Sequence, residues 1–281
     1  MDQYYLLGSP VAHSLSPAMM HAAFSALGID AAYGLIDTNM LPLKEAVARL
    51  RSEAKGWNVT MPDKNSMALL CDELSTASMI GGSVNTVLSR DGRLIGHTTD
   101  GTGLIDALAR SGVSIRGGVM TLLGTGGAAS AILIQCALDG ASEIHVFANR
   151  PASKARVLAI KEKLSPHTET SIAVHGYEDP EELKAALAKS RVLVQATNVG
   201  MEGTAQENGC LIPDPSFLPR DLFVYDIIYH PEETPLLEMA RRAGCRTENG
   251  RSMLLMQGAA SFRIWTGRDM PVELVYEKVF S

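Results

Sequence analysis

The chain has 281 residues, of which 46% are hydrophobic and 20% charged, and its formal net charge is −6. These values are typical of a globular protein of one large or two modest domains, and the negative charge disfavours nucleic acid or an anionic membrane as a partner. No apolar run reaches the ~18 residues of a membrane-spanning helix, and the N-terminus lacks a signal-peptide pattern. The four cysteines are scattered without a Cys-x-x-Cys pair, so we expect a cytoplasmic protein with neither a metal site nor a disulfide.

The first third of the chain predicts a mixed α/β domain. A helix should begin at Ser16 and Pro17, with Ser16 as its cap, and should end at Gly28. The dipeptide Asp91-Gly92 is a strong signal for a β-hairpin. Apolar runs bounded by turn residues predict strands at 4–7, 57–60, 83–89 and 94–98.

The middle of the chain alternates strands with helices, as in an open parallel sheet. The run at 119–123 is apolar apart from Thr121, as expected of a strand covered on both faces, and a helix should follow at 126–139. Two helices after Gly250 should pack back on the first domain. The remaining predicted elements are strands at 143–148, 171–174, 192–196 and 223–227, a helix from about 151, and helices at 252–266 and 271–280.

A glycine-rich loop, Gly124-Thr125-Gly126-Gly127-Ala128, lies between the apolar strand and its helix. Small residues there would let a pyrophosphate approach the backbone at a helix N-terminus. The next strand ends at Asn149-Arg150, with Lys154 four residues on and no acid to bind ribose hydroxyls. Cations without an acid favour a 2′-phosphate, so we expect NADP as the cofactor, with NAD accepted as well.

We therefore expect two α/β domains. The first is a discontinuous N-terminal substrate domain of residues 1–101, completed by the C-terminal helices at 250–281. The second is a Rossmann-like, parallel-sheet NAD(P)-binding domain of residues 102–249.

Lys64 and Asp100 both precede the glycine loop. Taken alone, a lysine is usually solvated and an aspartate at a helix start usually caps the helix. Together, ahead of a nucleotide-binding fold, they suggest proton transfer coupled to hydride transfer. Which of the two is the formal base stays open.

Ser14 and Ser16 are two hydroxyls at i and i+2 on an extended segment, so they could point the same way and hold a carboxylate or hydroxyls. Helix capping alone would explain Ser16, whereas Ser14 has no such local role. Other polar side chains near strand ends or within an apolar helix are individually more typical of structural roles; they are Asn58, Thr60, Asn85 and Gln257.

Taken together, these segments resemble the shikimate dehydrogenase family, in particular its quinate/shikimate dehydrogenase branch. The similarity runs over nearly the whole chain, and an unrelated Rossmann protein would share only the glycine loop. The matching segments are 8–17, 58–64, 82–86, 99–101, 124–128, 149–150, 196–201, 229–231, 234–237 and 253–259.

The resemblance implies an NAD(P)-dependent oxidoreductase that interconverts shikimate and 3-dehydroshikimate, with quinate and 3-dehydroquinate as a further substrate pair. The alternatives are a dehydrogenase acting mainly on quinate and a non-catalytic module that senses shikimate or quinate. Intact Lys64, Asp100 and glycine loop disfavour the sensor. Only a small-molecule partner is expected, with no nucleic acid, membrane or metal, and the protein would be a monomer or homodimer.

The resemblance also implies a role for each site residue. Lys64 and Asp100 would be the catalytic pair. Substrate would be bound by Ser14, Ser16, Thr60, Asn85, Tyr229 and Gln257. The cofactor would be bound by Gly124, Gly126, Gly127, Ala128, Asn149, Arg150, Lys154, Thr197, Val199, Met201 and Gly250.

Three positions depart from the family pattern. Thr98 stands where the family usually has asparagine, two residues before Asp100, and Ser83 replaces the usual alanine. Lys154 stands where NADP-specific members often place an arginine, and the two cations are not equivalent at a phosphate.

Overall fold

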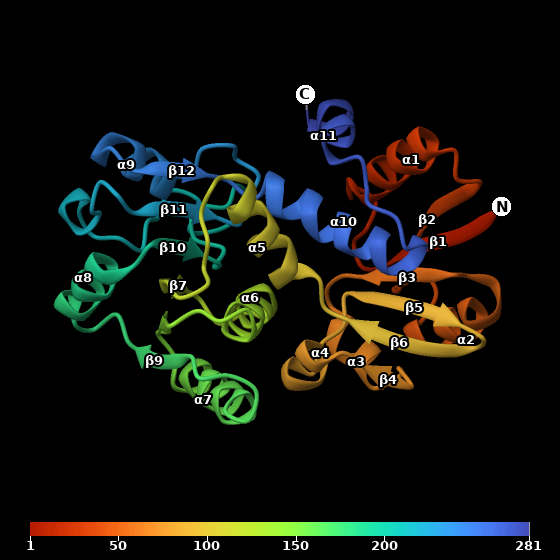
Figure 1. Cartoon of the computed structure of the whole chain (residues 1–281), viewed down its shortest axis with the longest axis horizontal. Helices are drawn as coiled ribbons and strands as arrows, with labels where there is room; N and C mark the ends of the chain where they lie inside the picture. Colours follow the sequence, from red (N-terminus) through yellow and green to blue (C-terminus); the bar gives the residue numbers. More distant parts are fainter. Residues whose placement is uncertain (281) are drawn as a thin grey trace. The chain divides into compact units, whose positions relative to one another are not determined.

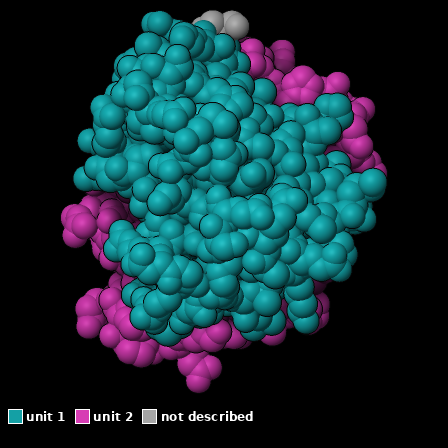
Figure 2. All heavy atoms as spheres, turned by 90° about the vertical axis from the view of Figure 1, so that its right-hand side faces the viewer, with its two compact units in different colours: residues 1–103, 254–281 teal, residues 104–253 magenta. Residues whose placement is uncertain are grey.

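The computed structural model describes residues 1–280 and divides the chain into two compact units (Figure 1). Unit 1 comprises residues 1–103 and 254–281, and unit 2 comprises residues 104–253. Figure 2 shows the two segments of unit 1 as one continuous body, although they are far apart in sequence. The chain leaves unit 1 within helix α5 (Asp100–Arg110) and returns within α10 (Arg251–Thr266). The predicted boundaries, after residues 101 and 249, precede the observed ones.

Unit 1 contains a six-stranded mixed sheet in the order β2-β1-β3-β5-β6-β4. Strand β1 pairs in parallel with β2 and β3, whereas β5 is antiparallel to both of its neighbours. The carboxyl ends of β1, β3 and β6 therefore lie at the same edge of the sheet as the amino end of β5. The strands are β1 (Asp2–Gly8), β2 (Ala31–Asp37), β3 (Gly56–Val59), β4 (Glu73–Leu74), β5 (Thr86–Arg90) and β6 (Arg93–His97).

Both faces of this sheet are buried, and successive side chains of β1 serve opposite faces. Tyr4 and Leu6 belong to a core cluster with residues of α1, α10 and α11. Leu7 belongs to a second cluster, with residues of α2 and α3. The helices of unit 1, besides the parts of α5 and α10 noted above, are α1 (Ser16–Leu27), α2 (Leu43–Glu53), α3 (Lys64–Ala68), α4 (Thr76–Gly81) and α11 (Val272–Phe280).

Unit 2 contains a six-stranded, fully parallel sheet in the order β12-β11-β10-β7-β8-β9. The chain winds outward from β7 in one direction and from β10 in the other, which is the Rossmann arrangement. The predicted α/β class with a Rossmann-like parallel sheet is confirmed. The strands are β7 (Val119–Leu123), β8 (Glu143–Phe147), β9 (Ser171–His175), β10 (Val192–Gln195), β11 (Phe223–Asp226) and β12 (Arg246–Glu248).

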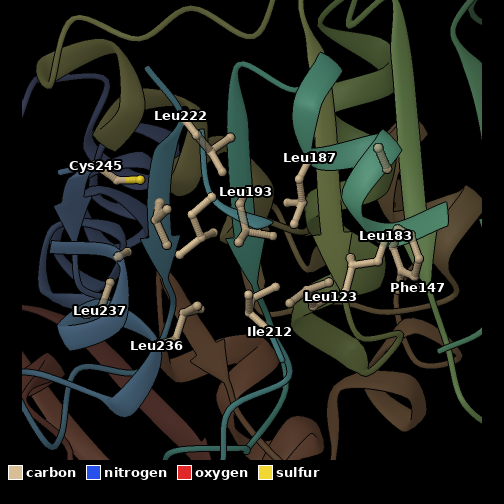
Figure 3. Close-up of a cluster of buried hydrophobic side chains, with 14 residues drawn as sticks. Leu123, Phe147, Leu183, Leu187, Leu193, Ile212, Leu222, Leu236, Leu237 and Cys245 are labelled. Carbon is tan, nitrogen blue, oxygen red and sulfur yellow. The ribbon is translucent and has the colours of Figure 1, made fainter. Parts of the chain in front are cut away.

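A core of apolar side chains covers one face of the unit 2 sheet. Figure 3 shows Leu183 and Leu187 of α8 and Leu236 and Leu237 of α9 gathered around Leu193 of β10, and all five are buried. The helical elements of unit 2 are α6 (Gly127–Leu138), α7 (Pro151–Leu164), α8 (Pro180–Lys189), the short η1 (Pro215–Phe217) and α9 (Pro235–Ala243). Among residues 1–280, none of the helices combines the length and the apolar character needed to cross a membrane.

Candidate active site

In unit 1 the candidate site is built on loops at one edge of the sheet. The loop after β1 touches the loop after β3, because the Ser9 N–H donates a hydrogen bond of 3.0 Å to the Met61 carbonyl oxygen. Gly8 makes this approach possible: its φ is 152°, and a Cβ there would lie 2.4 Å from Cγ2 of Thr60. Ligands of open α/β sheets bind outside the carboxyl ends of strands, which is where these loops lie.

Lys64 and Asp100 form an ion pair at this edge. Lys64 begins α3 after β3, Asp100 begins α5 after β6, and Nζ lies 2.6 Å from Oδ2. Their side chains are 21% and 13% exposed, so the pair is largely shielded but open to a small molecule. The Asn85 side-chain amide donates a 2.8 Å hydrogen bond to the other oxygen, Oδ1 of Asp100. The two oxygens of Asp100 thus bind two candidate site residues, Lys64 at the start of α3 and Asn85 just before β5.

Ser14 and Ser16 lie at the start of α1, but their local roles differ from the prediction. The helix begins at Ser16, and Leu15 occupies the cap position without a side-chain hydrogen bond. It is Ser14 whose Oγ accepts the Ser16 N–H, at 3.2 Å. The prediction that Ser16 caps the helix, and that Ser14 has no local role, was wrong. A hydroxyl that accepts this bond can still donate its hydrogen to a ligand.

Thr60 and Gln257 reach the same region from different elements. Thr60 is half-buried just after β3, and its N–H donates to the Leu7 carbonyl of β1. Gln257 is half-buried on α10, where its side-chain amide donates 2.9 Å to the Leu254 carbonyl. One turn later on α10, the Ser261 hydroxyl lies 3.3 Å from the Thr99 hydroxyl, beside Asp100. The α10 helix therefore approaches the start of α5.

Three buried hydroxyls near Asp100 were not predicted from the sequence. Thr86, Thr99 and Ser261 are 0%, 2% and 0% exposed, and all three belong to the hydrogen-bonded cluster around Asn85. One sequence signal could have identified Ser261, because a serine four residues after Gln257 interrupts the apolar face of the same helix.

In unit 2 the glycine loop follows β7, where the strand order reverses. Gly124 has a φ of 109°, and a Cβ there would lie 2.7 Å from the Ala196 carbonyl oxygen at the end of β10. Gly126 occupies the cap position of α6, and open space surrounds the point where a Cβ of Gly126 or Gly127 would lie. The backbone here can meet a phosphate at the helix N-terminus, so the residues fit a dinucleotide.

Three cationic side chains lie at the start of α7, which follows β8. Arg150 is exposed at the cap position of α7, directly after the exposed Asn149. Lys154 lies on the first turn of α7, with Nζ 3.7 Å from Oε1 of Glu178. A third cation, which the sequence analysis missed, is Arg156, whose guanidinium donates 3.3 Å to the Thr125 carbonyl of the glycine loop. This excess of positive charge suits a phosphate.

The other predicted cofactor residues lie in loops after β10 and β12. The Thr197 hydroxyl donates to Oε1 of Gln195 at 2.9 Å and accepts the Val199 N–H at 3.1 Å, so it shapes this turn. Met201 is 38% exposed at its end. Gly250 packs against β11, since a Cβ there would lie 2.0 Å from the Ile227 carbonyl oxygen.

Tyr229 lies on the loop after β11 and is 42% exposed. Both flanks of this loop are tied to Asp226, the last residue of β11. Its Oδ1 accepts the Ile228 N–H at 3.0 Å, and its Oδ2 accepts the Thr234 hydroxyl at 2.7 Å. Asp226 is fully buried, and this burial raises the pKa of its carboxyl to about 7 against the two hydrogen bonds that lower it.

The four cysteines are unpaired, and residues 1–280 contain no group of three or more histidine, cysteine or acidic side chains placed to hold a metal ion.

A Rossmann sheet with a glycine loop at its strand reversal, joined to an α/β unit with a shielded Lys–Asp pair, defines a nucleotide-dependent dehydrogenase. Comparison with known proteins shows the family to which the chain belongs. The family model described as "Shikimate dehydrogenase substrate binding domain" matches residues 6–87, and the "Shikimate 5'-dehydrogenase C-terminal domain" matches residues 250–280.

Relatives match along the whole chain. A shikimate dehydrogenase (NADP(+)) of Listeria monocytogenes is 42% identical over 98% of this chain and 94% of its own length. The crystal structure of shikimate 5-dehydrogenase from Listeria monocytogenes, in complex with shikimate and NAD, has a TM-score of 0.94 at 41% identity and covers 99% of this chain and 96% of its own. The quinate dehydrogenase from Corynebacterium glutamicum in complex with NAD has a TM-score of 0.87 at 27% identity, with coverages of 99% and 98%.

The chain belongs to the shikimate dehydrogenase family. The predicted family and the predicted class of NAD(P)-dependent oxidoreductase are confirmed.

Proposed function

We propose that the chain catalyses the NAD(P)-dependent interconversion of shikimate and 3-dehydroshikimate, with Lys64 and Asp100 as its catalytic pair. One observation carries the residue assignment. The two side chains, 36 positions apart in sequence, meet at 2.6 Å at the ligand-binding edge of unit 1. Membership of the family supports the reaction, since its named relatives act on shikimate and are named or bound with NADP and NAD.

The pair handles the proton of the reaction. When shikimate is oxidised, its C3 hydroxyl loses a proton and its C3–H leaves as hydride; the nicotinamide supplies the hydride acceptor. Lys64 and Asp100, already joined by a hydrogen bond, take up the hydroxyl proton and stabilise the charge on the developing carbonyl oxygen. In the reverse direction they return the proton. Which of the two exchanges it first is left open.

Unit 1 supplies the substrate site in this proposal, and unit 2 the cofactor site. Ser14 and Ser16 hold the carboxylate through hydroxyls at the start of α1. Thr60, Asn85 and Gln257 bind ring hydroxyls, and Tyr229 is a further proposed substrate-binding residue. The cofactor residues are those of the glycine loop and those that follow β8, β10 and β12: Gly124, Gly126, Gly127, Ala128, Asn149, Arg150, Lys154, Thr197, Val199, Met201 and Gly250.

Quinate is the second candidate substrate, because a quinate dehydrogenase shares this fold at 27% identity. The Ser14 and Ser16 hydroxyls favour shikimate, since quinate carries an additional C1 hydroxyl that the carboxylate site must accommodate. The protein is further proposed to act in the cytoplasm as a monomer or homodimer.

The test measures the absorbance of reduced nicotinamide with shikimate or quinate and with NADP or NAD. The parent should turn over shikimate, and Lys64→Ala should lower kcat by roughly 10²–10⁴-fold, as expected for loss of a general acid or base. Lys44→Ala is the matched control, because Lys44 is an exposed lysine on α2 of the same unit. No turnover of shikimate by the parent would refute the function. Activity of Lys64→Ala within a few-fold of the control would refute the catalytic assignment.

A further inference from the structure

Polar side chains rarely line a protein interior without a reason, yet a cluster of them lies behind the catalytic pair. Asn58, Asn85 and Thr99 are 6%, 4% and 2% exposed, and Thr86 and Ser261 are 0% exposed. They come from β3, from β5 and the residue before it, from the residue before α5, and from α10. Such buried networks fix one arrangement of their members when every group is satisfied.

One end of the network fixes the orientation of Asn58. The Tyr33 hydroxyl donates 2.8 Å to Oδ1 of Asn58, and burial raises the pKa of Tyr33, which keeps that hydroxyl protonated. The amide nitrogen of Asn58 therefore faces the other way, where it lies 3.0 Å from the oxygens of both Thr86 and Ser261. The same nitrogen also lies 3.1 Å from the Asn85 carbonyl oxygen, which shares its two hydrogens. An amide nitrogen cannot accept a hydrogen bond, so both hydroxyls direct their own hydrogens elsewhere.

The hydroxyl hydrogens then have a preferred direction. Thr86 and Ser261 lie 2.8 Å apart, and the Thr86 hydroxyl is 3.0 Å from Oδ1 of Asn85. The Ser261 hydroxyl donates 3.0 Å to the Gln257 carbonyl, one turn earlier on α10. The Thr86 hydroxyl can therefore donate to Oδ1 of Asn85. The Thr99 N–H also donates to this amide oxygen, at 2.8 Å.

We propose that Thr86 is a positioning residue, which holds the Asn85 amide with its oxygen toward Thr86 and its nitrogen toward Asp100. The inference rests on the proposed catalytic role of Asp100. Asn85 donates 2.8 Å to Oδ1 of Asp100 only in this orientation. After a rotation of the amide, its oxygen would face a carboxylate oxygen, and two acceptors at that distance repel each other. The Asp100 carboxylate would then shift relative to Lys64.

Thr86→Val tests the proposal, because valine keeps the shape and the β-propensity of threonine and removes the hydroxyl. It should lower kcat for shikimate roughly tenfold through misplaced catalytic groups, while the KM for the cofactor stays unchanged. Thr86→Ser restores the hydroxyl and should recover most of the lost kcat. The matched control is Thr121→Val, since Thr121 is a fully buried strand threonine of unit 2 whose hydroxyl lies 2.8 Å from that of Ser190.

Ser261→Ala is a second comparison from the same network, at a helix position that alanine tolerates well. The Ser261 hydroxyl donates to the Gln257 carbonyl rather than to Asn85, so this variant should lower kcat less than Thr86→Val does. If Thr86→Val lowers kcat no more than Ser261→Ala or Thr121→Val, or if Thr86→Ser fails to restore it, the Thr86 hydroxyl has only a structural role. The proposed function fails separately, if the parent does not turn over or Lys64→Ala stays active.

Discussion

Asp226 is a fully buried carboxyl without a cationic partner among its described hydrogen bonds, and it ties down both flanks of the Tyr229 loop. We expect Asp226→Asn to remove a pH-dependent destabilisation of the folded protein. Burial raises the pKa of Asp226 from its ordinary 3.8 to about 7. Below the lower value the group is protonated whether the chain is folded or unfolded. As the pH rises, the unfolded chain releases this proton first, so the free energy of unfolding falls until the folded protein also ionises near pH 7.

The size of the effect follows from the shift. Each unit of pKa corresponds to about 1.4 kcal/mol, so the full shift is worth about 4 kcal/mol. The unfolded group is already ionised at pH 5, which leaves about 3 kcal/mol to be lost between roughly pH 5 and pH 8. Asparagine can still accept the Ile228 N–H, but its amide nitrogen must face the Thr234 hydroxyl. That exchange costs about 1 kcal/mol at every pH.

The assay is urea unfolding of parent and Asp226→Asn, followed by circular dichroism at several pH values and constant ionic strength. All other titrating groups are shared, so the difference between the two proteins isolates Asp226. That difference should move by about 3 kcal/mol in favour of the variant as the pH rises from 5 to 8. A difference that stays constant over this range would show that the carboxyl is ionised throughout and would refute the reasoning.

Two further expectations concern the binding residues. Arg150→Ala should raise the KM for NADP roughly tenfold at low salt, because a guanidinium pairs strongly with phosphate. The same variant should barely change the KM for NAD. An equal rise in KM for both cofactors, or a parent that prefers NAD tenfold, would contradict a 2′-phosphate site. Arg242→Ala on α9 is the control variant. Ser14→Ala should raise the KM for shikimate about fivefold with kcat nearly unchanged, since it removes one ground-state hydrogen bond. An unchanged KM would remove Ser14 from the carboxylate site.

Elements with a clear hydrophobic pattern or a characteristic turn sequence were predictable from the sequence. Val119–Leu123 is a strand as its largely apolar run indicates, and the hairpin turn at Asp91-Gly92 has both residues at positive φ, 52° and 75°. Other elements were not predicted, among them β2 and the helices α8 and α9. The two helices do carry start signals that were overlooked, because Asp179-Pro180 and Thr234-Pro235 each place a capping side chain before a proline. Strand β2 is an edge strand with a mixed burial pattern, and hence its sequence does not alternate cleanly.

The candidate site was predictable as a set of residues but not as a set of contacts. The Lys64–Asp100 pair was proposed from motif and order alone, and the structure supplies the 2.6 Å contact. The hydrogen bonds of the two serine hydroxyls were harder to predict. A shift of one residue in the start of α1 changes which of Ser14 and Ser16 accepts a backbone N–H. The contact between Thr86 and Ser261 joins segments 175 positions apart, and the local signal at Ser261 does not indicate which segment it meets.

The antiparallel strand β5 explains why residues so distant in sequence form the pair. Lys64 follows β3, and Asp100 follows β6. A residue that follows a strand antiparallel to β3 lies at the opposite edge of the sheet from Lys64. The hairpin at Asp91-Gly92 reverses the chain once more, so that β6 runs in the direction of β3 and ends at the same edge. These two reversals of chain direction place Asp100 beside Lys64. The same strand arrangement places Asn85, just before β5, at this edge, where its side-chain amide can hold the Asp100 carboxylate in place.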